Sequence, residues 1–271
     1  MQYDPIKRSL GDLFNQSVFL RKIFYNLLDL LLLRCWHIHK ELRKWKAALP
    51  ATSDIKILDA GAGFGQYSYW MHKLDKNFNI LSVDVKEEQV ADCNNFMKQI
   101  NASDKVKFIV GDLTQYQSPD TYDLVVCVDV MEHIEDDRAC FRNYCASLKK
   151  GGMLLISTPS DQGGSDVKED SDESFIEEHV RDGYNIDEIQ EKIRTAGFSK
   201  IEARYNYGTP GKISWRFSMK YPIQALGVTK LFFIVLPFYY VLVYPFCFIL
   251  NWMDTNQEHK TGTGLVVKAW K

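Results

Sequence analysis

The chain has 271 residues, of which 46% are apolar and 25% charged, and its formal net charge is −2. This composition is typical of one large or two small packed domains, and it excludes wholesale disorder, collagen-like repeats and a multi-span membrane protein. The balanced charge predicts no nucleic-acid partner, and six cysteines without a CxxC pair indicate reduced thiols in a cytosolic protein.

The N-terminal segment has the apolar spacing of a helix. Apolar residues recur every three or four positions through residues 18–48, most regularly from Phe19 to Leu32, and Pro50 cannot continue a helix. We therefore expect a helical cap over residues 1–50.

After the cap, β-rich runs alternate with helical stretches, which predicts an α/β fold with a parallel sheet and helices on both faces. The uninterrupted apolar run Leu124–Val128 fits a central strand, and Gly151 and Gly152 are expected to end the preceding helix. We expect strands at residues 55–59, 79–85, 105–110, 122–129, 153–157, 200–206 and 264–270, and helices from the first turn to 74 and at 87–100, 136–148 and 186–196.

A glycine-rich turn follows the first expected strand and opens a helix. Gly61, Gly63 and Gly65 allow a tight turn and a close approach to a ligand, and Asp59 stands just before them. A dinucleotide fingerprint would read GxGxxG, whereas here the third glycine comes one position early. The Asp59 carboxylate would repel a phosphate but suit a cationic ligand, which favours S-adenosylmethionine (SAM) over NAD.

Acidic residues also follow the next three strands, and the carboxyl ends of parallel strands meet at one edge of a sheet. Asp84 is placed to accept hydrogen bonds from both ribose hydroxyls, and the Gly111-Asp112-Leu113 segment to accept one from an adenine amino group. Asp129 ends the fourth strand beside the same crevice. The alternative is a structural strand–helix turn with incidental surface acids.

In these segments the chain resembles the class I SAM-dependent methyltransferases, within the broad small-molecule group that includes ubiquinone and menaquinone methyltransferases. The resemblance implies a Rossmann-like sheet whose last strand is antiparallel, a SAM-binding domain over residues 51–271 and SAM as the cofactor. The matching segments are ILDAGAGFGQ (57–66), LSVDV (81–85), VGDL (110–113), YDLVVCVDVMEHIED (122–136), LKKGGMLLIST (148–158) and HVRDGYNIDEIQEKIRTAGF (179–198).

The resemblance also implies roles for the residues at these motifs. Asp84 would hold the ribose, and Asp129 would lie near the amino group of the methionine part. The methionine part would be held by Asp59, Gly61, Gly63 and Gly65, and the adenine by Asp112 and Leu113.

His133 is the candidate catalytic base. Methyl transfer from a sulfonium needs alignment and exclusion of water, but a hydroxyl acceptor must also lose a proton, and histidine suits that role near neutral pH. The alternative is a histidine that caps the next helix or packs against the cofactor. Asp129, Glu132 and His133, joined by His179, could instead bind a divalent cation, although a solvated acidic edge is the default expectation and we assign no metal.

An apolar insertion, residues 207–258, separates the last two expected strands. Leu231–Met253 holds 23 residues without a charge, long enough to span a membrane. A single crossing would carry the last strand away from the sheet, and Pro237 and Pro245 are expected to break a continuous helix. A bent element that enters one leaflet and returns satisfies both constraints.

The flanks of this run suit an anionic membrane surface. The stretch from Ala203 to Met253 contains no acidic residue but five basic ones, Arg204, Lys212, Arg216, Lys220 and Lys230, and the expected cap adds further basic residues, Arg34 among them. The alternative is that the insertion packs on the cap as an ordinary core or as a dimer interface.

Together these features predict a SAM-dependent methyltransferase that acts on a small, apolar or lipid-like acceptor. The predicted location is cytoplasmic, peripheral on the inner face of the membrane. The alternatives are a soluble small-molecule methyltransferase that uses the insertion as a dimer interface, and a non-catalytic SAM-binding membrane scaffold. An NAD-dependent oxidoreductase is disfavoured by the glycine spacing.

Overall fold

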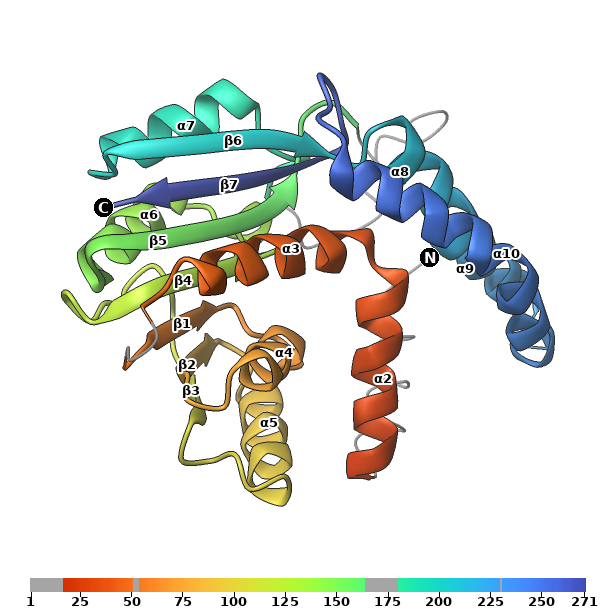
Figure 1. The fold of residues 1–271 in the computed structure, drawn as a ribbon, viewed down its shortest axis with the longest axis horizontal. Coiled ribbons are helices and arrows are strands. Elements are labelled where there is room, and N and C mark those ends of the chain that lie inside the picture. Colours follow the sequence, from red (N-terminus) through yellow and green to blue (C-terminus); the bar gives the residue numbers. More distant parts are fainter. Residues whose placement is uncertain (1–16, 51–53, 164–179, 230) are drawn as a thin grey trace.

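A seven-stranded sheet with strand order β3-β2-β1-β4-β5-β7-β6 organises the computed structural model, which describes residues 17–50, 54–163, 180–229 and 231–271 (Figure 1). Only β7 runs antiparallel to its neighbours, so the predicted mostly parallel sheet with an antiparallel last strand is confirmed. The strands are β1 (Lys56–Ala60), β2 (Asn79–Asp84), β3 (Val106–Val110), β4 (Tyr122–Val128), β5 (Leu148–Pro159), β6 (Lys200–Asn206) and β7 (Gly264–Trp270).

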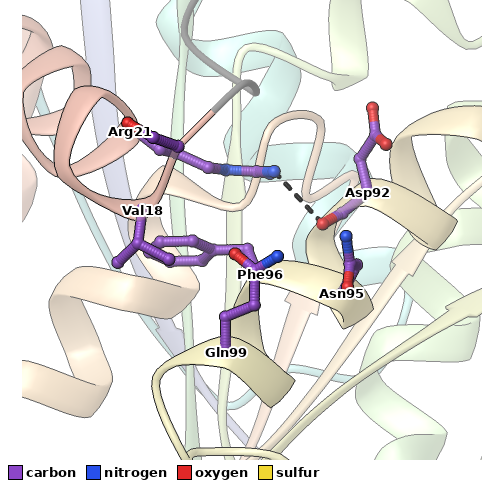
Figure 2. Close-up of a pocket in the computed structure, with 7 residues that line it drawn as sticks. Val18, Arg21, Asp92, Asn95, Phe96 and Gln99 are labelled. Carbon is purple, nitrogen blue, oxygen red and sulfur yellow. Dashed lines mark hydrogen bonds between the residues drawn. The ribbon is translucent and has the colours of Figure 1, made fainter.

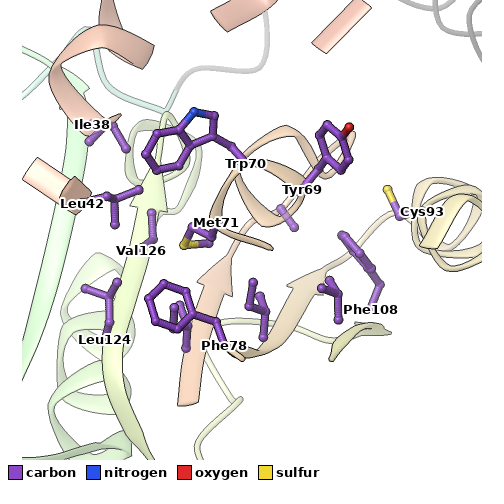
Figure 3. Close-up of a cluster of buried hydrophobic side chains, with 14 of the residues drawn as sticks. Ile38, Leu42, Tyr69, Trp70, Met71, Phe78, Cys93, Phe108, Leu124 and Val126 are labelled. Atoms are coloured by element: carbon purple, nitrogen blue, oxygen red, sulfur yellow. The ribbon is translucent and has the colours of Figure 1, made fainter. Parts of the chain in front are cut away.

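Both faces of the sheet are covered by helices because successive residues of a strand point to opposite faces. Within β4, Leu124 and Val126 pack on one side with α4 (Gln66–Leu74) and α5 (Glu87–Gln99), as Figure 3 shows. Val125 and Cys127 pack on the other side with α6 (Asp137–Ser147) and α7 (Ile186–Thr195). The doubly covered central strand agrees with the apolar run that predicted it.

The described part of the cap, residues 17–50, forms two helices, α2 (Val18–Leu31) and α3 (Leu33–Ala47), so the prediction of one helix through residues 18–48 is wrong. Residues 1–16 of the expected cap lie outside the described residues. The backbone of Leu32 is extended between them, and its side chain is buried. The break lets α3 lie on the sheet, where Ile38 and Leu42 join the core (Figures 1 and 3). The carbonyl of Leu30, left without a helical partner at the end of α2, accepts a hydrogen bond from the indole of Trp36 at 3.0 Å.

The expected stop at the glycine pair after α6 is also corrected. Helix α6 ends at Ser147, and β5 begins at once and runs through Gly151 and Gly152. Gly151 has φ +80°, and the register against β4 shifts between Tyr122 and Leu124. The glycines therefore form an irregularity inside the strand, where a left-handed residue is needed.

The apolar insertion forms a helical hairpin (residues 209–256) that extends beyond the end of the sheet (Figure 1). Its first arm is α8 (Thr209–Trp215), a π-helical turn (Arg216–Lys220) and α9 (Tyr221–Val228), and its second arm is α10 (Phe232–Asn256). Hydroxyls of Tyr239 and Tyr240 donate to carbonyls of Phe217 and Ser218 at 2.7 and 2.8 Å, so the second arm satisfies acceptors of the irregular turn.

Helix α10 runs through both prolines, so the prediction that they break it is wrong. A proline removes the donor to the carbonyl four residues earlier, here those of Phe233 and Val241. Both residues are more than 45% exposed, at 47% and 73%, so those carbonyls do not lie in the protein core. By length and composition α10 could cross a membrane, and only 6% of its apolar window is buried.

Asp59 ties the end of β1 to α4 and to β2 beneath the glycine turn. The carboxylate is 2% exposed and accepts a hydrogen bond from the hydroxyl of Ser68, which lies 2.7 Å from the hydroxyl of Ser82. Burial, with a smaller contribution from Asp84, raises the pKa of Asp59 to about 6. The ionised carboxylate therefore costs folding free energy at neutral pH.

We expect Asp59→Asn to stabilise the ligand-free protein at pH 7 but not at pH 4. Because the pKa of Asp59 is higher in the folded than in the unfolded protein, the wild type keeps its full unfolding free energy below the unfolded pKa and loses part of it as pH rises to 6. Asparagine does not titrate, so the variant does not suffer this loss. Chemical denaturation should give a difference in unfolding free energy that grows to about 3 kcal/mol above pH 6. A difference independent of pH between 4 and 7 would contradict this role of Asp59.

Candidate functional site

The glycine turn between β1 and α4 is left-handed at three positions. Gly61, Gly63 and Gly65 have φ of +78°, +49° and +76°. A Cβ on Gly61 would lie 2.3 Å from Val130, but a Cβ on Gly63 would meet nothing within 4 Å. The turn is therefore packed at Gly61 and open at Gly63, which is where a ligand can approach the backbone.

Asp84 lies against this open side of the turn. Its carboxylate accepts hydrogen bonds from the amides of Gly63 at 2.7 Å and Lys86 at 2.9 Å. The side chain is thus held at the carboxyl end of β2 in direct contact with the turn, as the sequence predicted. A half-exposed carboxylate in this position has the acceptor chemistry that ribose hydroxyls require.

The predicted adenine residues lie at the end of β3. Leu113 is buried, while the carboxylate of Asp112 accepts from the amide and hydroxyl of Thr114 at 2.8 and 2.7 Å, which lowers the pKa of Asp112. Val85 and Val110, which the sequence reading did not select, are 64% and 53% exposed at the same edge. Apolar residues at the end of a strand or directly after it, at the edge where ligands bind, are the sequence signal that could have identified these two valines as candidate contacts for the adenine ring.

Asp129 and Arg34 form the charged centre of the site. Asp129 follows β4 with φ +51°, a strained conformation for a residue other than glycine, and its carboxylate lies 2.5 Å from the guanidinium of Arg34 on α3. The sequence reading counted Arg34 only among the basic residues of the cap, because its pairing is a long-range contact. A cation beside an anion matches the carboxylate and ammonium groups of an amino acid.

The cap also contacts the glycine turn through α2. Arg21, 5% exposed, donates to the carbonyl of Phe64 at 3.2 Å, and the hydroxyl of Tyr25 donates to the same carbonyl. Figure 2 shows Arg21 over a hollow between α2 and α5, where it also donates to the carbonyl of Asp92. This hollow contains none of the predicted site residues.

Glu132 and His133 follow Asp129 in a short 3₁₀ turn but differ in environment. Glu132 is 1% exposed and accepts from the hydroxyl of Thr158 at 3.1 Å, and burial together with Asp129 raises its pKa to about 8. His133 is exposed at the edge of the sheet. His179 of the alternative metal set lies outside the described residues, and within those residues no three His, Cys, Asp or Glu side chains group as a metal site.

These residues fit SAM as a bound group. The donor set at one edge comprises an open backbone turn, a carboxylate on that turn and an opposite-charge pair, with apolar side chains beside them. Each feature has a matching part in a nucleoside that carries an amino acid. Asp59 is not in open contact with this edge, because its carboxylate is turned towards Ser68.

A family model described as a methyltransferase domain matches residues 51–197, just over half of the chain. A ubiquinone biosynthesis O-methyltransferase from Rickettsia akari is 27% identical over 39% of this chain and 41% of its own length. A phosphoethanolamine N-methyltransferase from Triticum aestivum is 28% identical over 55% of this chain and 28% of its own length. The chain thus spans less than half the length of these curated relatives.

Solved structures agree on the fold. A phosphoethanolamine N-methyltransferase 2 from Haemonchus contortus in complex with SAM has a TM-score of 0.61 at 21% identity, over 86% of this chain and 52% of that one. A [4+2]-cyclase has a TM-score of 0.57 at 16% identity, over 86% and 80%. The fold alone therefore does not determine the reaction. The family match confirms the predicted resemblance: this chain belongs to the methyltransferase domain family and has the fold of the class I SAM-dependent methyltransferases.

Proposed function

We propose that this protein transfers a methyl group from SAM to a small, apolar or lipid-like acceptor at the cytoplasmic face of a membrane. The observation that carries the proposal is the 25-residue apolar helix α10, which is largely exposed. It is the second arm of the hairpin, which joins the sheet at the edge where the candidate SAM-binding residues lie. The hairpin leaves the sheet after β6 and returns before β7, and Asn206 pairs with Gly264 in the register of those strands. Both ends of the hairpin thus begin at the ligand edge.

The exposed side chains of α10 favour a helix that lies in the plane of the membrane interface. The most exposed of them recur three, four or seven positions apart along one face. Phe233, Val235, Phe246 and Phe248, outside that stripe, are 46–51% exposed, so the apolar surface extends over the whole length of the helix and around much of it. The chain leaves the sheet after β6 and returns to the same edge at β7, which argues against a single crossing of the membrane. The stripe includes Leu231, Ile234, Phe238, Val241, Leu242, Ile249 and Trp252, which are between 57% and 80% exposed.

Basic residues on the first arm support an anionic surface. Lys212, Arg216 and Lys220 follow one another along α8 and the π-helical turn, and no acidic residue intervenes. Each basic residue near an anionic surface contributes about 1 kcal/mol of attraction. A core helix would instead be mostly buried, so α10 needs a partner that the described residues of the chain do not supply.

When bound, SAM supplies an electrophilic methyl group on its sulfonium. Asp84 would accept from the ribose hydroxyls, the turn at Gly63 would hold the methionine part, and Arg34 and Asp129 would bind the carboxylate and ammonium of that part. The hydrogen bond from the amide of Gly63 to the carboxylate of Asp84, at 2.7 Å, fixes the end of β2 against the glycine turn. The remaining task is to align the acceptor and exclude water.

His133 acts as the base for a hydroxyl acceptor. It is exposed at the carboxyl end of β4, four residues after Asp129, so an acceptor on this edge can reach it. Glu132 is buried and bonded to the hydroxyl of Thr158, and burial raises its pKa, so the exposed His133 is the better placed of the two.

We expect His133→Ala to lower methyl transfer about 100-fold while the affinity for SAM stays within about twofold, because the histidine acts on the acceptor. Transfer from methyl-labelled SAM into membrane lipid extract, with SAM titration by calorimetry, separates the two effects. Asn77→Ala, at an exposed position in the loop at the opposite edge of the sheet, is the control. A parallel loss of SAM affinity would make His133 structural, and loss of wild-type rate on chelation would favour the metal alternative.

We expect the double variant Phe238→Glu with Leu242→Glu to release the protein from vesicles. These side chains are 72% and 80% exposed, and burying each in lipid is worth about 1.5–3 kcal/mol, so vesicle affinity should fall at least about tenfold. Co-sedimentation is measured with phosphatidylcholine vesicles, with and without phosphatidylglycerol, at low and high salt. Wild-type binding should be stronger with the anionic lipid and weaker in salt.

Asn77→Glu with Ser103→Glu is the charge-matched control, because both residues are exposed in loops at the opposite edge of the sheet. This control should bind vesicles like the wild type apart from a small electrostatic loss. A wild-type protein that ignores vesicles and sediments as a dimer, which the Phe238→Glu and Leu242→Glu variant dissociates, would establish the dimer interface instead.

A further inference from the structure

The base of the hairpin is joined to the cap by one buried carboxylate. Asp254, in the last turn of α10, is fully buried. One oxygen accepts from the amide of Tyr207 at 3.1 Å and contacts Nε2 of His37 at 2.9 Å. The other accepts from the amide of Gly211 at 3.0 Å and lies 3.2 Å from Nε2 of His259. Asp254 thus holds α3, α8 and the segments that flank β6 and β7.

The tautomer of His37 follows from its two neighbours. A guanidinium nitrogen of Arg204 lies 3.1 Å from Nδ1, and since a guanidinium can only donate, Nδ1 accepts. Nε2 therefore carries the hydrogen and donates to Asp254. His37 lies one turn after Arg34 on α3, so this bond fixes the helix that carries the arginine of the site.

Tyr207 makes the second link from Asp254 to Arg34. Its backbone has φ +53°, which is costly for a tyrosine and is stabilised by the bond from its amide to Asp254. Its hydroxyl accepts from the backbone amide of Arg34 at 3.1 Å. Arg34 is the second residue of α3, where the amide has no partner within the helix, and Leu32 provides no side-chain cap.

We propose that Tyr207 and Asp254 are positioning residues that hold Arg34 for the carboxylate of SAM, and that they thereby join the hairpin to the cofactor site. The proposal rests on the role of Arg34 given under the proposed function. The tyrosine hydroxyl replaces the missing cap at the start of α3, and the carboxylate fixes both the tyrosine backbone and the next turn of that helix. With these contacts in place the guanidinium stays 2.5 Å from Asp129.

The test compares two ligands that differ at the amino acid part. S-adenosylhomocysteine has the carboxylate, whereas 5′-deoxy-5′-methylthioadenosine keeps the adenosine and sulfur but lacks it. By calorimetry, Tyr207→Phe should weaken S-adenosylhomocysteine about threefold to tenfold and leave methylthioadenosine within about twofold. Tyr205→Phe, which removes a hydroxyl two residues earlier that bonds Gln162 at 2.8 Å, should change neither affinity.

A double-mutant cycle then assigns the effect to Arg34. In an Arg34→Met background Tyr207→Phe should cause no further loss of S-adenosylhomocysteine affinity. Equal weakening of both ligands, or an undiminished effect in that background, would overturn the positioning role. If Arg34→Met itself leaves the preference for S-adenosylhomocysteine unchanged, the assignment of Arg34 to the carboxylate fails as well. Asp254→Asn should repeat the Tyr207→Phe pattern, and Tyr207→Phe alone decides the question if that variant does not fold.

Discussion

The insertion of β7 between β5 and β6 is the constraint on which the rest of the molecule depends. Strand β7 pairs with both neighbours over its whole length: Gly264 lies opposite Pro159 of β5 and Asn206 of β6. The chain between β6 and β7 must therefore return to the edge of the sheet that it left at the end of β6. That edge is also where β1, β2 and β4 deliver the glycine turn, Asp84 and Asp129. An apolar hairpin and a cofactor site therefore lie at the same edge of one sheet.

Charge is concentrated at this edge and is neutralised there by the cap. Asp129 pairs with Arg34, and the buried carboxylate of Asp254 accepts from two amides and from His37, while Nε2 of His259 lies 3.0 Å from the backbone carbonyl of Asp254. A buried carboxylate without such partners would cost several kcal/mol, so the hairpin base cannot separate from α3 without that loss. The cap thus contributes Arg34 to the candidate site, although the matched methyltransferase family model begins only at residue 51.

Local patterns predicted the sheet and the strand ends that carry the candidate site residues. The bounds of β6 and β7 agree with the expected residues 200–206 and 264–270, and Asn185 caps α7 by accepting from the amides of Asp187 and Glu188. These features depend on alternation, caps and turns, which lie within a few residues of one another. The placement of Asp84 at the edge that carries the glycine turn followed from the expectation that the strands are parallel.

What sequence reasoning missed depends on contacts between distant segments. Arg34 pairs with a residue almost a hundred positions away, and nothing in its own neighbourhood distinguishes it from the other basic residues of the cap. The break at Leu32 arises because α3 packs on the sheet, and α10 remains helical through Pro237 and Pro245 because the carbonyls they leave are at its surface. Helix-breaking rules describe an isolated segment and not its packing.

An apolar acceptor that is reached at the membrane should give a methylated product that dissolves in organic solvent, and partition of the labelled product is the most direct test. The protein is incubated with methyl-tritiated SAM and a total cell extract that contains membranes, and the products are partitioned between organic solvent and water. Label should accumulate in the organic phase, and much less of it with the Phe238→Glu and Leu242→Glu variant, whose cofactor site is intact. Label that appears only in the aqueous phase, in equal amounts with both proteins, would contradict a membrane acceptor.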